Sequence, residues 1–212
     1  MTTALVDYDS GNLHSAQKAF ERMAAEVGAG PIIVTGDPDV VARADRIVLP
    51  GDGAFPHCRS QLYAQSGLAE AITEAVTRRA VPFFGICVGM QMLATTGHEH
   101  ADTPGFGWIA GDIRQITPAD PALKVPHMGW NDLVIDTPHP VLDGIATGEH
   151  AYFVHSYAMQ VSNPAERLAH VEYGGDVTAI IGRDNIIGTQ FHPEKSQHAG
   201  LRMIANFLSW RP

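Results

Sequence analysis

Short apolar runs alternate with amphipathic stretches along the first half of the chain. Runs without polar alternation predict buried strands over residues 4–8, 32–34, 46–49 and 81–86. Between them, Asn12 is placed to cap a first helix, Asp37-Pro38 begins a second, and residues 62–79 form a further helical stretch. Buried strands separated by helices favour an α/β fold, in which helices flank an open, mostly parallel central sheet.

Beyond residue 107 the spacing of the apolar runs changes. Strand-like segments become short and closely spaced, over residues 108–116, 132–135, 152–157, 168–173, 178–181 and 186–190. Turn residues such as Gly174-Gly175 separate them, which favours antiparallel strands added to the parallel sheet in the C-terminal half. We expect a closing helix over residues 198–210. No repeat or linker interrupts the pattern, so residues 1–212 are predicted to form a single domain.

Charge and composition exclude several classes of protein. Lys and Arg number 14 against 23 Asp and Glu, and the net charge of −9 argues against a nucleic-acid surface. The longest apolar stretch, residues 80–90, falls well short of the roughly 20 residues of a membrane span. No secretory leader is evident, and two cysteines suit a reducing compartment, so we expect a cytoplasmic protein. The two histidines of the His-Glu-His segment at 98–100 would not share a helical face, so we expect no metal site there. We also expect no cofactor.

Residues 85–89, Gly-Ile-Cys-Val-Gly, end a buried strand and precede a helical run. A Gly-x-nucleophile-x-Gly sequence at such a junction permits a sharp turn that projects the central side chain over the carboxyl edge of the sheet. The start of the helix favours the thiolate form of Cys87, and the Val88 N–H would point toward an oxyanion formed by its attack. The pattern is also compatible with a small buried thiol that has no catalytic role.

A thiolate nucleophile usually needs a base and a group that orients the base. His192 and Glu194 follow a predicted strand and are separated only by Pro193. Side chains two residues apart in extended chain lie on the same side, so the carboxylate can hold one imidazole nitrogen while the other faces the thiol. A His-Pro-Glu sequence alone is a weak signal. Together with the turn at 85–89, it predicts that Cys87, His192 and Glu194 act as one catalytic unit.

These two segments resemble those of the Cys-His-Glu glutamine amidotransferases. Residues 85–91 and 188–196 carry the resemblance to this superfamily. Further segments are most similar to the glutaminase subunits of imidazole glycerol phosphate synthase: residues 7–8 with 11–13, 50–55 (Pro-Gly-Asp-Gly-Ala-Phe), 126–131 (Pro-His-Met-Gly-Trp-Asn) and 152–157 (Tyr-Phe-Val-His-Ser-Tyr). Because they occur in the family's order, the resemblance covers nearly the whole chain.

The resemblance implies hydrolysis of L-glutamine to glutamate and ammonia through a glutamyl thioester on Cys87. His192 would move the protons and Glu194 would orient its ring. Backbone N–H donors to the oxyanion are implied at Val88 and at Asp52, where neighbouring glycines permit the peptide to turn. The implied substrate-binding positions are Gly51, Gly53, Gln91, Ser156 and Tyr157.

A heterodimer is also implied by the resemblance. Ammonia would pass, shielded from water, into a (β/α)8-barrel cyclase subunit. That subunit would complete an imidazole ring and give imidazole glycerol phosphate and an aminoimidazole carboxamide ribotide, in histidine biosynthesis. The positions that match interface segments of the family are Asn12, Trp130, Tyr152 and Lys195.

Two positions depart from the family's pattern. Asp52 stands where the family usually carries a small apolar residue such as valine, and Asp9-Ser10 replaces a glycine-led turn. A carboxylate beside a developing oxyanion would repel it unless the side chain turns away.

Other functions stay open at this point. The chain is also compatible with a glutaminase subunit of pyridoxal phosphate or purine synthesis, and with a self-sufficient γ-glutamyl hydrolase. A third alternative is a relative that only binds a partner, although the joint presence of Cys87, His192 and Glu194 counts against it.

Overall fold

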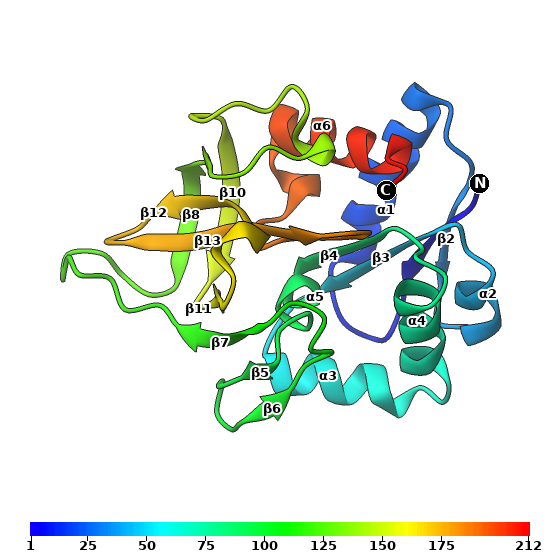
Figure 1. Cartoon of the computed structure of the whole chain (residues 1–212), viewed down its shortest axis with the longest axis horizontal. Helices are drawn as coiled ribbons and strands as arrows, with labels where there is room; N and C mark the ends of the chain where they lie inside the picture. The colour runs from blue at the N-terminus through cyan, green and yellow to red at the C-terminus, as the bar shows by residue number, and fades with distance from the viewer.

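An eight-stranded sheet runs through the computed structural model, which describes all 212 residues (Figure 1). Its first five strands are parallel and its last three are antiparallel. In spatial order they are β2 (Ile32–Thr35), β1 (Thr3–Val6), β3 (Arg46–Gly51), β4 (Phe83–Cys87), β14 (Ile186–Thr189), β13 (Asp176–Arg183), β12 (Arg167–Glu172) and β9 (Val134–Ile135). The predicted mostly parallel sheet with antiparallel additions is confirmed.

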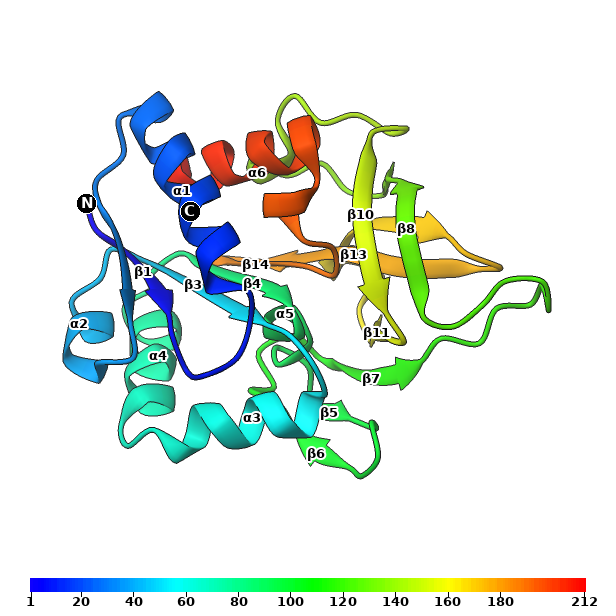
Figure 2. The ribbon, with the colours of Figure 1, turned by 180° about the vertical axis from the view of Figure 1, so that it is seen from behind.

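Helices cover both faces of the parallel half (Figure 2). On one face lie α1 (Leu13–Val27) and α6 (Gln197–Ser209), and on the other lie α2 (Pro38–Ala42), α3 (Phe55–Ala64) and α4 (Leu68–Thr77). The start of α1 follows from local chemistry, because Asn12 Oδ1 accepts the N–H of Ser15. Asp37 caps α2 in the same way, ahead of Pro38.

Two helical predictions were wrong in their bounds. The stretch predicted over residues 62–79 covers the end of α3 and all of α4, because the chain is extended at Gln65 (ψ 110°) and left-handed at Gly67 (φ +80°), where a helix cannot continue. The helix after the turn at 85–89 is only one turn long, α5 (Val88–Gln91). The site therefore lies at the start of a short helix, close to the loop that follows it.

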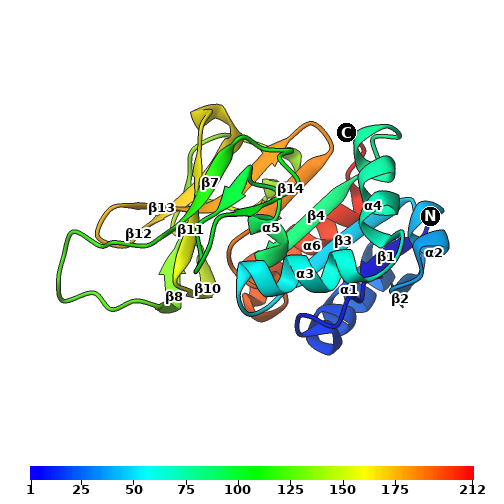
Figure 3. The ribbon, with the colours of Figure 1, turned by 90° about the horizontal axis from the view of Figure 1, so that it is seen from below.

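Two smaller sheets pack beside the antiparallel half of the large sheet (Figure 3). One pairs β10 (His150–His155) with β8 (His127–Asp132), and the other contains β11 (Tyr157–Val161), β7 (Gly111–Gln115), β5 (Thr96–Gly97) and β6 (Thr103–Pro104). The segments predicted over residues 108–116 and 152–157 therefore do not join the large sheet, whose antiparallel side is already filled by β13, β12 and β9. The second of these segments is divided at Ser156, where the chain passes from one small sheet to the other.

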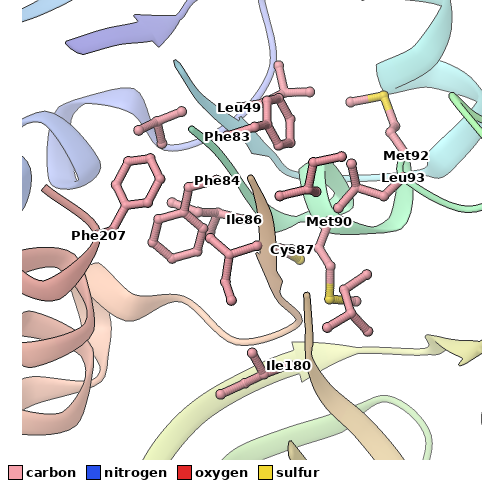
Figure 4. Packing of buried hydrophobic residues seen from close by; sticks show 14 of the residues in the cluster. Leu49, Phe83, Phe84, Ile86, Cys87, Met90, Met92, Leu93, Ile180 and Phe207 are labelled. Carbon is pink, nitrogen blue, oxygen red and sulfur yellow. The ribbon is translucent and has the colours of Figure 1, made fainter. Parts of the chain in front are cut away.

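Aromatic packing fixes β4 at the centre of the core (Figure 4). Phe84 packs against Phe207 of α6 at 5.1 Å between ring centroids, and Phe83 meets the edge of Trp108 at 5.3 Å. Since successive side chains of a strand point to opposite faces, these contacts hold β4 from both sides. The end of β4, where Cys87 lies, is thereby held rigidly. None of the helices has the length and apolar character needed to cross a membrane.

Candidate active site

Cys87 occupies a strained turn between β4 and α5. Its φ of 54° and ψ of −112° are rare for a residue with a side chain, and such strain often occurs where function requires it. The turn also requires glycine on both sides. A Cβ at Gly89 would lie 1.8 Å from Leu49 O, and one at Gly85 would lie 2.6 Å from Gly89 O. The predicted sharp turn with close backbone approach is therefore present.

His192 reaches the same point from the other end of the chain. Thr189 of β14 pairs with Ile86 of β4, so the residues that follow these two strands emerge side by side. His192 Nδ1 lies 3.0 Å from Glu194 Oε1, and both side chains are almost fully buried, at 4 % and 2 % exposure. The structure thus brings the histidine and the carboxylate together as the i, i+2 spacing predicts.

The charge state of His192 depends on its two neighbours. Burial alone would lower the pKa of the ring, but hydrogen bonding and charge from Cys87 and Glu194 raise it to about 10. Nε2 is buried and has no aligned hydrogen-bond partner in this conformation. The raised pKa favours the protonated ring, and its second nitrogen is left available near the sulfur. A loose contact of this kind is common before substrate binds.

The backbone at Asp52, directly after β3, is turned toward Ser10 and Cys58. Asp52 N–H points to Ser10 Oγ at 3.5 Å, while Ser10 and Cys58 both donate to Asp52 O, at 3.0 and 3.2 Å. The two positions that depart from the family's pattern thus contact each other. Asp52 is exposed, so its carboxylate is solvated. The peptide must turn before Asp52 N–H can serve an oxyanion, whereas Val88 begins α5 directly after the thiol.

A cavity of about 260 Å³ opens beside the sulfur, smaller than the ~300–1,000 Å³ of a drug-sized site. Its lining includes Cys87 and most of the positions predicted to bind substrate or oxyanion: Asp52, Gly53, Val88, Gln91, Ser156 and Tyr157. Gly51 lies behind it instead, where a Cβ would be 2.8 Å from both Gly89 N and the Tyr8 hydroxyl. Gly51 therefore acts through close packing.

Glu99 also lines this cavity, and sequence reasoning missed it. Its Oε2 accepts the N–H of Phe55 at 2.8 Å, which anchors the carboxylate at the start of α3. The residue belongs to the His-Glu-His segment, which was considered only as a metal site. There, His98 is bound to Asp102 and Asp112 instead. The structure thus places a fixed negative charge at the edge of the pocket.

Two buried histidines support the strand that lines the pocket. His155 Nδ1 lies 2.8 Å from Tyr157 O, so this nitrogen must be the donor. His155 Nε2 then accepts from His127 Nδ1 at 3.0 Å, and His127 Nε2 accepts from Asn131 at 3.2 Å. Burial lowers the pKa of each ring to about 4. Both rings are therefore neutral, and the chain of hydrogen bonds runs in one direction toward the substrate pocket.

This neutral pair makes the fold sensitive to acid. The pKa of each ring is about 4 in the folded chain, while an unperturbed histidine has about 6.5. Between these values the unfolded chain binds more protons, so the free energy of unfolding falls with decreasing pH, by up to ~1.4 kcal/mol per pH unit for each ring. Glutamine takes up no proton, so in the His155→Gln chain we expect the free energy of unfolding, measured with urea, to fall less steeply as the pH is lowered over this range. An equal slope would contradict this account.

The predicted partner-facing residues occupy the surface. Trp130 is 50 % exposed beside Met128, which is 66 % exposed, and both belong to β8. Trp130 pairs with Tyr152 across β8 and β10, with ring centroids 5.8 Å apart. Asn12 is exposed at the start of α1, where it serves as the helix cap, and Lys195 is half-buried directly after Glu194.

Comparison with known proteins relates this geometry to a family. The chain is 71 % identical to the imidazole glycerol phosphate synthase subunit HisH of Cereibacter sphaeroides and 66 % identical to that of Ruegeria pomeroyi, over all of both chains in each case. Among solved structures, a glutamine amidotransferase matches with a TM-score of 0.73 at 16 % identity, over 98 % of this chain and 99 % of the other. The glutaminase domain of Trypanosoma brucei CTPS matches with a TM-score of 0.66 at 15 % identity, over 100 % and 95 %. These distant structures show the fold alone.

The model of the class-I glutamine amidotransferases matches residues 5–210, nearly the whole chain. This range includes the strained turn at Cys87 and the His192–Glu194 pair. The relatives named HisH agree with the resemblance seen in the segments at 126–131 and 152–157, and they do not support an amidotransferase of another pathway. The chain belongs to the class-I glutamine amidotransferase family, among the HisH subunits of imidazole glycerol phosphate synthase.

Proposed function

We propose that this chain hydrolyses L-glutamine to glutamate and ammonia at Cys87 and supplies the ammonia to a cyclase subunit of imidazole glycerol phosphate synthase. One observation carries the proposal. His192 is held by Glu194 through Nδ1, and its Nε2 is buried without another partner near a thiol on a strained turn. Such a pair suits a nucleophile, because the carboxylate orients the ring and leaves its other nitrogen free to exchange a proton with the thiol.

The reaction follows from the charges at the site. The Cys87 sulfur attacks the carbonyl carbon of the glutamine side chain, and the carbonyl electrons move to oxygen. His192, as an imidazolium, gives a proton to the amide nitrogen, which leaves as ammonia and yields a thioester. The neutral ring then takes a proton from water as the water attacks the thioester. The carbon–sulfur bond breaks, and the thiolate and imidazolium return.

The oxyanion formed on attack needs hydrogen-bond donors, and each donor typically lowers the activation free energy by about 3 kcal/mol. Val88 N–H is the first. Asp52 N–H is the second only after its peptide turns from Ser10, a movement that the flanking Gly51 and Gly53 permit. The resting site therefore lacks one donor, and we propose that docking of the cyclase subunit favours the turned peptide. Hydrolysis by the isolated chain is then slow.

Glutamine is held by polar groups around the cavity. We propose that Glu99 binds the α-ammonium group of the substrate, because it is the carboxylate that lines the cavity on a rigid anchor. We expect Glu99→Gln to raise the KM for glutamine by about 10- to 100-fold, as the loss of one charged hydrogen bond of ~1.5–3 kcal/mol implies. The turnover number should change little, since the α-ammonium group takes no part in the bond changes at the side-chain amide. Steady-state kinetics of the complex tests this, and a change confined to the turnover number would contradict it.

The exposed aromatic pair suits the proposed partner surface. Met128 and Trp130 are large apolar side chains that face solvent, and Tyr152 packs on the second of them. Exposed Trp, Tyr and Met are typical of interfaces. We propose that this surface, together with Asn12 and Lys195, contacts the cyclase subunit.

A glutaminase assay with and without that subunit tests the proposed function. Glutamate release by the chain alone should be low, and it should rise strongly when the cyclase subunit and its ribotide substrate are added. Rapid release without a partner would indicate a self-sufficient hydrolase instead. No release under either condition would indicate a binding protein.

A further inference from the structure

Gln190 lies between β14 and His192, and its side chain is fully buried. Its backbone N–H donates to Ala179 O of β13 at 2.8 Å, which fixes where the side chain begins. From there the amide reaches the active site, and Nε2 lies 3.7 Å from Cys87 Sγ. A buried amide thus contacts the reacting atom, although the mechanism above gives it no role.

The direction of this amide is set by its neighbours. Gln91 lies 3.1 Å from Tyr157 O, and because a carbonyl only accepts, the Gln91 atom facing it must be Nε2. The same Nε2 also lies 3.1 Å from the amide of Gln190, so the Gln190 atom facing it must be the oxygen. Nε2 of Gln190 is then the atom directed at Cys87. Both amide orientations follow without any hydrogen position being observed.

An N–H at this position is valuable because the surroundings are poor in positive charge. Cys87 is only 4 % exposed, and no lysine or arginine lines the cavity. Burial disfavours an unpaired thiolate, and hydrogen bonds to the charged form favour it. Besides the imidazolium of His192, the amide of Gln190 is the side chain placed to donate to the sulfur.

We propose that Gln190 is a further catalytic residue, whose Nε2–H stabilises the Cys87 thiolate, and that Gln91 is the positioning residue that sets its direction. The proposal rests on the proposed glutaminase function. As the sulfur bonds the substrate carbon, its negative charge passes to the carbonyl oxygen and the amide contact weakens. When water has attacked the thioester, the carbon–sulfur bond breaks and the sulfur keeps the electron pair. The amide then receives the departing thiolate.

Alkylation of Cys87 by iodoacetamide as a function of pH measures thiolate formation without substrate. Mass spectrometry separates it from Cys58, which is fully buried. In the full-length chain, we expect Gln190→Leu to raise the midpoint of alkylation by roughly one pH unit, a tenfold lower reactivity at a fixed pH below the midpoint. Gln190→Glu keeps the shape and the acceptor for Gln91 but replaces the donor with a carboxylate. Its midpoint should rise at least as far.

Controls separate this role from packing. Thr189 directly precedes Gln190, and its hydroxyl donates a buried hydrogen bond to Phe191 O. Thr189→Val removes that bond but no contact with the sulfur, so the midpoint of Cys87 alkylation should stay unchanged. Thermal unfolding identifies the variants that fold. Should neither Gln190 variant fold, Gln91→Met takes their place, because it frees the Gln190 amide to turn and should also raise the midpoint.

The possible outcomes are distinct. If Cys87 of the unaltered chain reacts no faster than an ordinary thiol, the proposed glutaminase function fails. If it reacts as a thiolate while the folded variants keep its midpoint, only the role of Gln190 is overturned.

Discussion

Replacing Cys87 with alanine is expected to lower glutamine hydrolysis by the assembled complex at least ~10⁵-fold, because no other group at the site can form the thioester. His192 and Glu194 would remain in place, but a base without a nucleophile contributes little. The other thiol, Cys58, is fully buried and already hydrogen-bonded to Ser10 and Asp52, so it cannot substitute. Glutamate formation in the presence of the cyclase subunit measures the effect.

Ammonia supplied directly is the control for this variant. The cyclase reaction with added ammonium should continue at its normal rate in the Cys87→Ala complex, because that step needs no glutaminase chemistry. Loss of both activities would point to a failure of assembly instead. If the variant kept glutaminase activity near that of the unaltered chain, the mechanism would be wrong.

Gly89→Ala is expected to lower the free energy of unfolding by more than ~3 kcal/mol, the upper range for overpacking a core. The added Cβ would lie 1.8 Å from Leu49 O, a backbone atom of the central strand β3. It can be accommodated only if β3 and the turn at Cys87 move apart. Urea unfolding, or failure to obtain folded protein, reports the effect.

Gly107→Ala provides the matched comparison. Gly107 has φ +68° and nothing within 4 Å of its Cβ position, so alanine there incurs only the left-handed backbone cost of ~1–2 kcal/mol. Gly89 has no left-handed φ and so incurs no such backbone cost, and a larger effect at Gly89 is therefore due to the close approach at the turn. Similar effects in both would mean that the close approach of Gly89 to β3 is not needed for folding.

The proposed catalytic unit was predictable because each of its two halves has a local pattern. A Gly-x-Cys-x-Gly sequence after a buried strand encodes a turn, and the i, i+2 spacing of His192 and Glu194 encodes their contact. The parallel half of the sheet was predictable for a similar reason. Its strands are buried on both faces, so they appear as uninterrupted apolar runs such as residues 46–49 and 81–86.

Groups that meet only in space were not predictable. Glu99 and Gln190 reach the site from a loop and from the end of β14, and their roles depend on partners far along the chain, Phe55 and Cys87. β8 was missed because its usual polarity is reversed: the exposed positions include the apolar Met128 and Trp130, and the less exposed ones include the polar His127 and Asn131. The division at Ser156 was also missed, because residues 152–157 were taken as one strand, whereas β11 begins at Tyr157 and continues to Val161.

Rapid acid quenching of the complex during glutamine turnover, followed by peptide mass spectrometry, shows whether Cys87 carries the covalent intermediate. A covalent intermediate must accumulate on the sulfur if attack is followed by slower hydrolysis. We expect a glutamyl adduct on the peptide that carries Cys87, and none when His192 is replaced by asparagine. An adduct on any other residue would contradict this mechanism. So would steady release of glutamate without an adduct on Cys87, together with full activity in the His192→Asn chain.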